Sequence, residues 1–198
     1  MQYPKPILDL ISSYMKLPGI GRKTAIRLAF HTLTMKDKDI DEFSLALANL
    51  KKNLCACSVC HRINENQICN ICSDKMRDET TICVVESDQD LMAMENTEQF
   101  SGHYHVLGGV ISPMNGIGPN DINLRSLLER AKSEKIKEII LATNSTPEGE
   151  GTASFILRIL QNTDIKVTRI AQGISFGSDL EYVDEMTLAR ALSARVEM

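Results

Sequence analysis

The sequence lacks tryptophan, has only 5% aromatic residues, and contains no apolar run near the roughly 20 residues that a membrane-spanning helix needs. So few aromatic rings argue against recognition of many stacked bases or sugars. Glycine and proline number only 11 and 6 against a hydrophobic fraction of 43%, which excludes collagen-like and largely disordered classes. Asp9 interrupts the first apolar stretch, so no secretory signal is expected. We expect a globular cytoplasmic protein with no membrane partner.

The net charge of −4 hides an asymmetry along the chain. Residues 1–54 carry nine basic and five acidic residues, whereas residues 80–198 carry ten basic and seventeen acidic residues. A basic N-terminal part and an acidic C-terminal part predict different partners for the two.

The N-terminal part reads as helical. Apolar residues recur at helical spacing up to residue 54, interrupted by the stretch Leu17–Gly21. Asp39 or Asp41 is the expected N-cap of the third helix.

From residue 80 onward, strand and helix patterns alternate. The expected strands are short apolar runs, and the expected helices are amphipathic stretches between and after them. The strands are 82–85, 106–107, 139–142 and 165–171, and the helices are 88–97, 121–134, 151–163 and 185–195. Such alternation predicts a parallel α/β sheet with helices on both faces. The predicted division is 1–54, helical; 55–79, a small cysteine-rich finger; 80–175, the sheet; and 176–198, a strand and helix extension.

Two glycines and three cations mark the break between the first two helices. Gly19 and Gly21 permit a tight turn, and the second helix then begins with backbone N–H groups that favour an anion. Arg22, Lys23 and Arg27 lie in or near its first turns. This stretch resembles the helix-hairpin-helix motif, which holds DNA by its backbone without reading sequence. The alternative is an ordinary turn with a solvated basic face.

Cys57-x2-Cys60 and Cys69-x2-Cys72 stand eight residues apart. Two such knuckles make a tetrahedral four-sulfur site that suits structural Zn²⁺ and leaves no position for water. A disulfide or a redox Cys-x-x-Cys pair is the alternative. Cys55 could replace a ligand, although Cys57 has the better spacing.

Carboxylates follow two of the expected strands. Glu86 and Asp88 come after residues 82–85, and Glu148 and Glu150 come after residues 139–142. If these strands are neighbours, the four carboxylates converge at the carboxyl edge of the sheet. They would then hold Mg²⁺ or present a negative surface to a basic protein. A solvated loop with helix caps is the third interpretation.

Val84–Ser87, Ala142–Asn144 and Glu148–Glu150 resemble the Toprim domain of topoisomerases, primases and some nucleases. Preceded by a hairpin and a four-cysteine finger, the whole chain resembles the RecR family of bacterial recombination mediators. Further matching stretches are Gln99–Gly102, Gly116–Pro119, Arg169–Gly173 and Leu180–Asp184.

The resemblance implies a DNA-binding repair protein without catalysis of its own. Such proteins act with RecO and RecF to help RecA load on gapped or single-stranded DNA, and they assemble as dimers of dimers into rings. Carried onto this chain, it implies DNA contacts at Lys23 and Arg27, zinc ligands and a RecO surface, and we expect residues 176–198 in subunit contacts. The hairpin itself adds Gly19, Gly21 and Arg22 to the expected DNA set. The DNA set is Gly19, Gly21, Arg22, Lys23 and Arg27; the zinc set is Cys57, Cys60, Cys69 and Cys72; the RecO set is Glu86, Asp88 and Glu148.

The competing interpretation is an enzyme, namely a Mg²⁺-dependent Toprim nuclease or nucleotidyl transferase. Glu86 would be its general acid or base, and Glu148 and Glu150 would hold the metal. Catalytic Toprim enzymes carry Asp-x-Asp where this chain has Glu148-Gly149-Glu150, and the longer side chains move the carboxylates by about one bond. A third interpretation makes the finger the DNA reader, but Arg62 is the only basic residue between Cys57 and Cys72.

Overall fold

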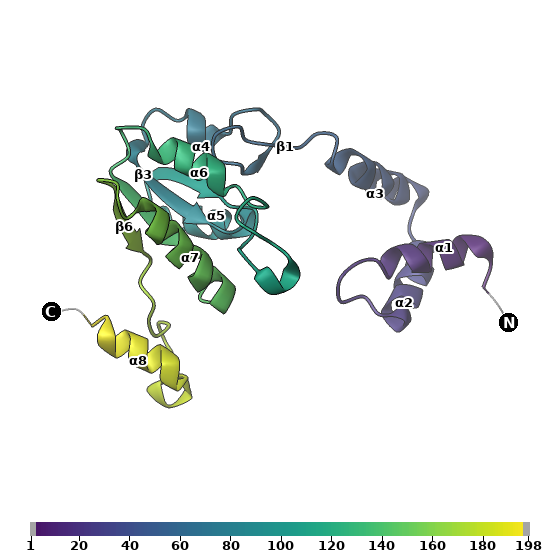
Figure 1. The fold of residues 1–198 in the computed structure, drawn as a ribbon. Helices are drawn as coiled ribbons and strands as arrows, with labels where there is room; N and C mark the ends of the chain where they lie inside the picture. The colour runs from purple at the N-terminus through teal and green to yellow at the C-terminus, as the bar shows by residue number, and fades with distance from the viewer. Residues whose placement is uncertain (1–2, 196–198) are drawn as a thin grey trace. The chain divides into compact units, whose positions relative to one another are not determined.

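A computed structural model describes residues 3–195 (Figure 1). The chain forms two compact units, Met1–Asn53 and Leu54–Met198. Within the described residues, no helix is long and apolar enough to cross a membrane.

The first unit contains three helices, α1 (Lys5–Tyr14), α2 (Arg22–Thr32) and α3 (Asp37–Leu50). The first two pack through a small core formed by Ile11, Ala25 and Ala29. Helix α3 begins directly after Lys36, so the prediction that Asp39 or Asp41 caps it is wrong. Asp37 and Asp39 instead lie in its first turn, where a negative charge favours the helix dipole. Helix α3 buries none of its residues.

The second unit is built on a four-stranded parallel sheet, which confirms the predicted α/β class. Its strands are β3 (Asp78–Val85), β4 (Gly102–Val106), β5 (Glu138–Ala142) and β6 (Lys166–Arg169), in the order β4-β3-β5-β6. Strands β3 and β4 each begin four residues earlier than predicted. The first half of β3 is polar and largely exposed, and β4 contains the buried but polar Tyr104 and His105, so apolar runs marked only the strand ends.

Three helices pack against the sheet: α5 (Asp88–Glu95), α6 (Leu124–Ala131) and α7 (Pro147–Leu160). Helix α8 (Glu185–Ser193) follows β6 after an extended segment and buries none of its residues (Figure 1). Helix α7 begins four residues before the predicted 151 because Thr146 caps it and Pro147 occupies its first position. Short 3₁₀ turns form at Pro113–Asn115 and Leu180–Tyr182.

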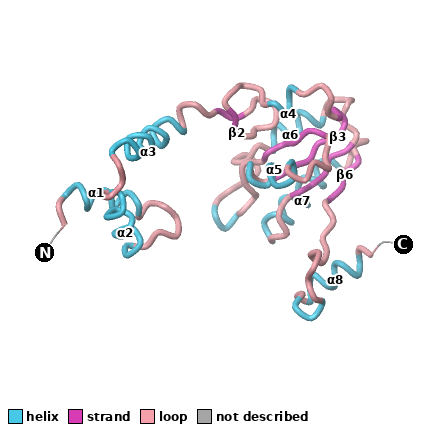
Figure 2. The backbone as a smooth tube through the Cα atoms, turned by 180° about the vertical axis from the view of Figure 1, so that it is seen from behind, coloured by secondary structure: helices cyan, strands magenta, loops and turns pink. Residues whose placement is uncertain are grey.

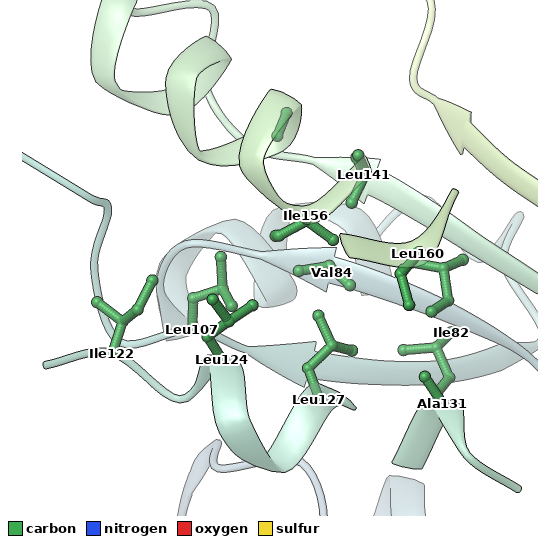
Figure 3. Close-up of a cluster of buried hydrophobic side chains, with 12 residues drawn as sticks. Ile82, Val84, Leu107, Ile122, Leu124, Leu127, Ala131, Leu141, Ile156 and Leu160 are labelled. Atoms are coloured by element: carbon green, nitrogen blue, oxygen red, sulfur yellow. The ribbon is translucent and has the colours of Figure 1, made fainter. Parts of the chain in front are cut away.

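Both faces of the sheet are covered, by different elements. On one face Ile82, Val84 and Leu141 pack against α6 and α7 through residues such as Leu127 and Ile156 (Figure 3). On the other face Cys83 and Val85 pack with α5 and with a small cysteine-rich finger. The finger consists of β1 (Cys55–Ala56), β2 (Ile63–Asn64) and α4 (Asn70–Ser73), and its strands and those of the sheet are seen from behind in Figure 2.

Candidate metal centre and nucleic-acid interface

Four cysteines of the finger form a compact cluster. The Sγ atoms of Cys57, Cys60, Cys69 and Cys72 all lie within 4.8 Å of one another, and three of these residues are fully buried. Each knuckle is closed by backbone bonds: His61 N–H donates to the Cys57 carbonyl at 2.9 Å, and Ser73 N–H donates to the Cys69 carbonyl at 3.0 Å. His61 adopts the left-handed backbone (φ 64°) that the first turn requires.

The cluster fits a metal better than it fits disulfides. Cys60 Sγ and Cys69 Sγ are 3.6 Å apart, far beyond the S–S bond of about 2.05 Å. Four sulfurs at about 2.3 Å from a tetrahedral Zn²⁺ would be separated by about 3.8 Å. Backbone N–H groups of Cys69 and Cys72 point at Cys57 Sγ and Cys69 Sγ, both at 3.4 Å, as expected around thiolates. These residues could therefore hold a metal ion.

The surroundings of the cluster shift the pKa values of its thiols in opposite directions. A hydrogen bond with the Cys72 thiol lowers the pKa of Cys60 to about 5, whereas burial raises the pKa of Cys69 to about 11. Because the thiolate is the form that binds metal, loading of the cluster releases protons. Cys55 is exposed and lies outside the cluster, so Cys57 is the residue that the structure places among the four.

Hydrogen bonds and an ion pair join the finger to β4 and α5. Val106 N–H of β4 donates to the Cys60 carbonyl at 2.8 Å. Asp88, at the start of α5, accepts a hydrogen bond from Ile63 N–H at 2.8 Å and lies 3.9 Å from the Arg62 guanidinium. Asp88 therefore links α5 to the finger. Asp88 and Ile63 are 25 residues apart in the sequence, so no local pattern indicates this contact.

The hairpin has the predicted geometry. Gly19 has a left-handed φ of +76°, and Gly21 is the N-cap of α2. Since glycine has no side chain, the first turn of α2 has no side-chain cap within the described residues. Arg22, Lys23 and Arg27 are all exposed around this helix end. The turn therefore offers uncapped N–H groups and three cations to an anion.

The predicted neighbours β3 and β5 do lie side by side, yet their carboxylates do not all converge. Glu86 and Asp88 line a cavity of about 440 Å³ with His61 and Asn144, whereas Glu148 lines a separate one of about 330 Å³. Glu86 accepts hydrogen bonds from Asn144 N–H at 2.8 Å and from its side-chain amide at 2.7 Å. Within the described residues the cysteine cluster is the only grouping of three or more metal-ligand side chains.

Glu150 lines a different cavity from Glu86 and has its own partners, so the predicted convergence of the four carboxylates at one site is not found among the described residues. Arg169 and Arg190 each lie 3.1 Å from its carboxylate, and Gln172 donates to it at 2.8 Å. The Gln172 hydrogen bond and the two guanidinium charges lower the pKa of Glu150 below its usual value. Its cation partners come from β6 and α8, because the chain folds back onto the start of α7.

Comparison with known proteins extends this picture. Residues 7–51 match the family described as "RecR, helix-hairpin-helix", residues 80–171 match "Toprim domain" and residues 173–196 match "RecR, C-terminal". The chain is 58% identical to "Recombination protein RecR" of Staphylococcus aureus (strain JH9) and 57% identical to that of Staphylococcus haemolyticus (strain JCSC1435). Both matches cover 198 residues, the full length of each chain. The chain belongs to the RecR family.

Membership in the RecR family confirms the predicted order of helix-hairpin-helix, cysteine finger, Toprim sheet and C-terminal part. It also makes this a recombination protein that fits a role in DNA binding and repair. Sequence reasoning missed two residues that bind Glu150, namely Gln172 and Arg190. Arg190 and Gln172 lie 40 and 22 residues from the Glu150 that they bind, so their roles depend on tertiary contacts. The sequence does contain a local signal for the start of α5, since Ser87 and Asp90 form a capping box there.

Proposed function

We propose that this protein is a non-catalytic recombination mediator that binds DNA and acts with RecO and RecF to load RecA on gapped or single-stranded DNA. The observation that carries the proposal is the uncapped start of α2 surrounded by Arg22, Lys23 and Arg27, in a chain of the RecR family. Gly19 and Gly21 would let the phosphate backbone approach closely. Its place of action would be the bacterial cytoplasm, where the DNA is.

The binding would be electrostatic and independent of base sequence. Phosphates would accept hydrogen bonds from the helix N–H groups, and the three cations would neutralise neighbouring phosphates. None of these groups is placed to distinguish base edges. Affinity should therefore fall steeply as salt rises.

Replacing Lys23 and Arg27 together by alanine tests this interface. We expect weaker binding at low salt, and a decrease of about two in the slope of log affinity against log salt for each bound chain, because two phosphate contacts are lost. Fluorescence anisotropy with gapped and single-stranded DNA measures both. The matched control is Lys51→Ala with Lys52→Ala, which removes the same charge from the end of α3. An unchanged affinity and salt slope in the Lys23/Arg27 variant would show that DNA binds elsewhere.

The pairing of the Toprim carboxylates supports a scaffold over a nuclease or nucleotidyl transferase. Glu86 is bonded to Asn144, Asp88 to the finger and Glu150 to two arginines. Binding Mg²⁺ at these carboxylates would require breaking several of these contacts. We infer that any Mg²⁺ there is weakly held.

Exposed acidic groups at the same edge suit a basic protein partner. Glu148 is exposed, and Glu86 opens into the cavity that it shares with Asp88. We propose that these three carboxylates form the surface that meets RecO. Complementary charge would chiefly speed association and select the partner.

We further propose that the protein assembles as a dimer of dimers into a ring. Helix α3 supports this because Phe43, Leu47 and Leu50 share one face and are 49%, 60% and 58% exposed. The extension at 176–198 would supply further contacts, since Phe176 and Tyr182 are also exposed. The division into 1–54, 55–79, 80–175 and 176–198 would then separate DNA binding, metal binding, partner binding and assembly.

Leu47→Asp with Leu50→Asp is expected to reduce the mass in sedimentation by breaking one class of subunit contact, since charges cannot be buried there without a partner. Leu45→Asp is the control, because Leu45 is 62% exposed on the opposite side of α3. A wild-type protein that sediments only as a 22.0 kDa chain at high concentration would contradict the assembly proposal.

A further inference from the structure

A zinc ion held by four thiolates has a net charge of −2, and this site is largely buried. Cys57, Cys60 and Cys69 are fully inaccessible and belong to the apolar cluster that includes Val85 and Tyr104. Burying net charge is costly unless a charge of opposite sign lies nearby. A cation that is not already paired with a carboxylate is therefore needed near the centre to offset its negative charge.

The arginines of the finger segment do not meet this need. Arg62 faces Asp88 at 3.9 Å, and Arg77 forms an ion pair with Glu95 and lies 3.8 Å from Asp74. Each is thus matched by a carboxylate. Lys75 has no ion pair with a carboxylate among the described residues, but it is exposed, so solvent screens its charge. A buried cation has to come from another part of the chain.

Arg130, at the end of α6, has the required properties. It is partly buried, and within the described residues it forms no ion pair with a carboxylate. Its Nη1 donates to the Tyr104 carbonyl of β4 at 2.7 Å and to His105 Nδ1 at 3.2 Å. Burial lowers the pKa of Arg130, and negative charge on the sulfurs of the cluster opposes that shift.

Two contacts connect this arginine to the cysteine cluster. His105 lies between Arg130 and the finger, with its ring 5.3 Å from the ring of His61, the residue after Cys60. Next along β4, Val106 N–H binds the Cys60 carbonyl at 2.8 Å. Since the Asn123 carbonyl can only accept, His105 Nε2 donates to it at 2.7 Å, and Nδ1 is left to accept from Arg130. The positive charge is held firmly in place by these bonds.

We propose that Arg130 is the outer-shell counter-ion of the Cys57, Cys60, Cys69 and Cys72 metal centre. Its guanidinium, anchored to β4, stabilises the dianionic tetrathiolate ion that zinc would form. Retention of the metal by the finger thus depends on helix α6, more than 50 residues further along the chain. The inference rests on the zinc site proposed for this protein.

Zinc transfer from the full-length protein to the chromogenic chelator 4-(2-pyridylazo)resorcinol tests the inference. Arg130→Met removes the charge and should release zinc faster, because losing an outer-shell partner typically weakens metal affinity roughly tenfold to a hundredfold. Arg130→Lys keeps the charge and should remain closer to wild type. The matched control is Arg125→Met on the same helix, where Arg125 is exposed and paired with Glu129 at 3.2 Å. It should release zinc at the wild-type rate.

Substitution of Co²⁺ for zinc provides a readout that general destabilisation would not reproduce. The thiolate-to-cobalt charge-transfer bands should shift in folded Arg130→Met and stay in place in Arg125→Met. If Arg130→Met does not fold, Arg130→Gln gives the same comparison, because it keeps a donor for the Tyr104 carbonyl and lacks the charge. Equal release rates for an uncharged Arg130 variant and for Arg125→Met would overturn the inference, as would equal rates for Arg130→Lys and Arg130→Met. Wild-type protein purified without zinc would instead refute the proposed metal site.

Discussion

Chelation of the proposed zinc ion from the intact protein is expected to unfold the Cys57–Cys72 segment and to lower the melting temperature of the sheet-bearing unit by more than about 10 °C. The finger has little apolar material of its own, and besides the cysteines only Ile71 is fully buried in it. Structural zinc contributes about 10 kcal/mol or more to folding in small fingers. Because the cysteines also cover one face of the sheet beside Cys83 and Val85, the loss should spread to the sheet.

Circular dichroism during heating, with and without chelator and after zinc is restored, measures the effect. Hydrogen exchange at the Val106 amide should accelerate at the same time, because that amide is bonded to the Cys60 carbonyl. Cys57→Ser should reproduce the metal-free behaviour, whereas Cys55→Ser should not, since Cys55 lies outside the four-thiol cluster. Loss of zinc from Cys55→Ser, or an unchanged melting temperature after chelation, would count against this assignment.

The cysteine centre and the hairpin could be predicted from the sequence because both are encoded within short stretches. Two Cys-x-x-Cys knuckles determine their own local turns, and Gly19 and Gly21 determine where α2 begins. The parallel sheet was likewise readable, since the ends of its strands are continuous apolar runs. In each case the signal lies within a few residues of the structure that it produces.

The sheet edge was less predictable because its contacts join distant segments. Asp88 is bound by the finger, and Glu150 is bound by Arg169 and Arg190, so two carboxylates expected to act with Glu86 have other partners. The polar residues Tyr104 and His105 also hid a buried strand from the sequence pattern. In the fold, the Tyr104 ring packs against Phe100, and His105 donates to the Asn123 carbonyl. A carboxylate in the sequence indicates that a hydrogen-bond donor or a cation is needed nearby. Which residue supplies it depends on tertiary contacts.

Gly149→Ala is expected to lower the free energy of unfolding by about 3 kcal/mol, because there is no room for a methyl group at this position. A Cβ at Gly149 would lie 2.2 Å from the Asn144 carbonyl oxygen and 2.7 Å from Glu86 Oε1. The oxygen belongs to backbone that is held in place, since Asn144 N–H binds Glu86 and the Thr143 hydroxyl donates to the Gly149 carbonyl at 2.9 Å. The loop between β5 and α7 would have to move, and the Glu86–Asn144 hydrogen bonds would break.

Gly151→Ala is the matched control, two residues further along the same helix. A Cβ there would meet no atom within 4 Å, so alanine should be tolerated and should raise the free energy of unfolding by up to about 1 kcal/mol through its better helix propensity. Urea unfolding of both variants measures the difference, and hydrogen exchange at the Asn144 amide reports whether Glu86 has lost its partner. If the two variants are equally stable, the close packing of Glu86 against the start of α7 is not what fixes this carboxylate. A lower free energy of unfolding for Gly149→Ala together with a higher one for Gly151→Ala would show that Gly149 is needed. Only glycine at this position lets α7 begin directly against the Glu86 side chain.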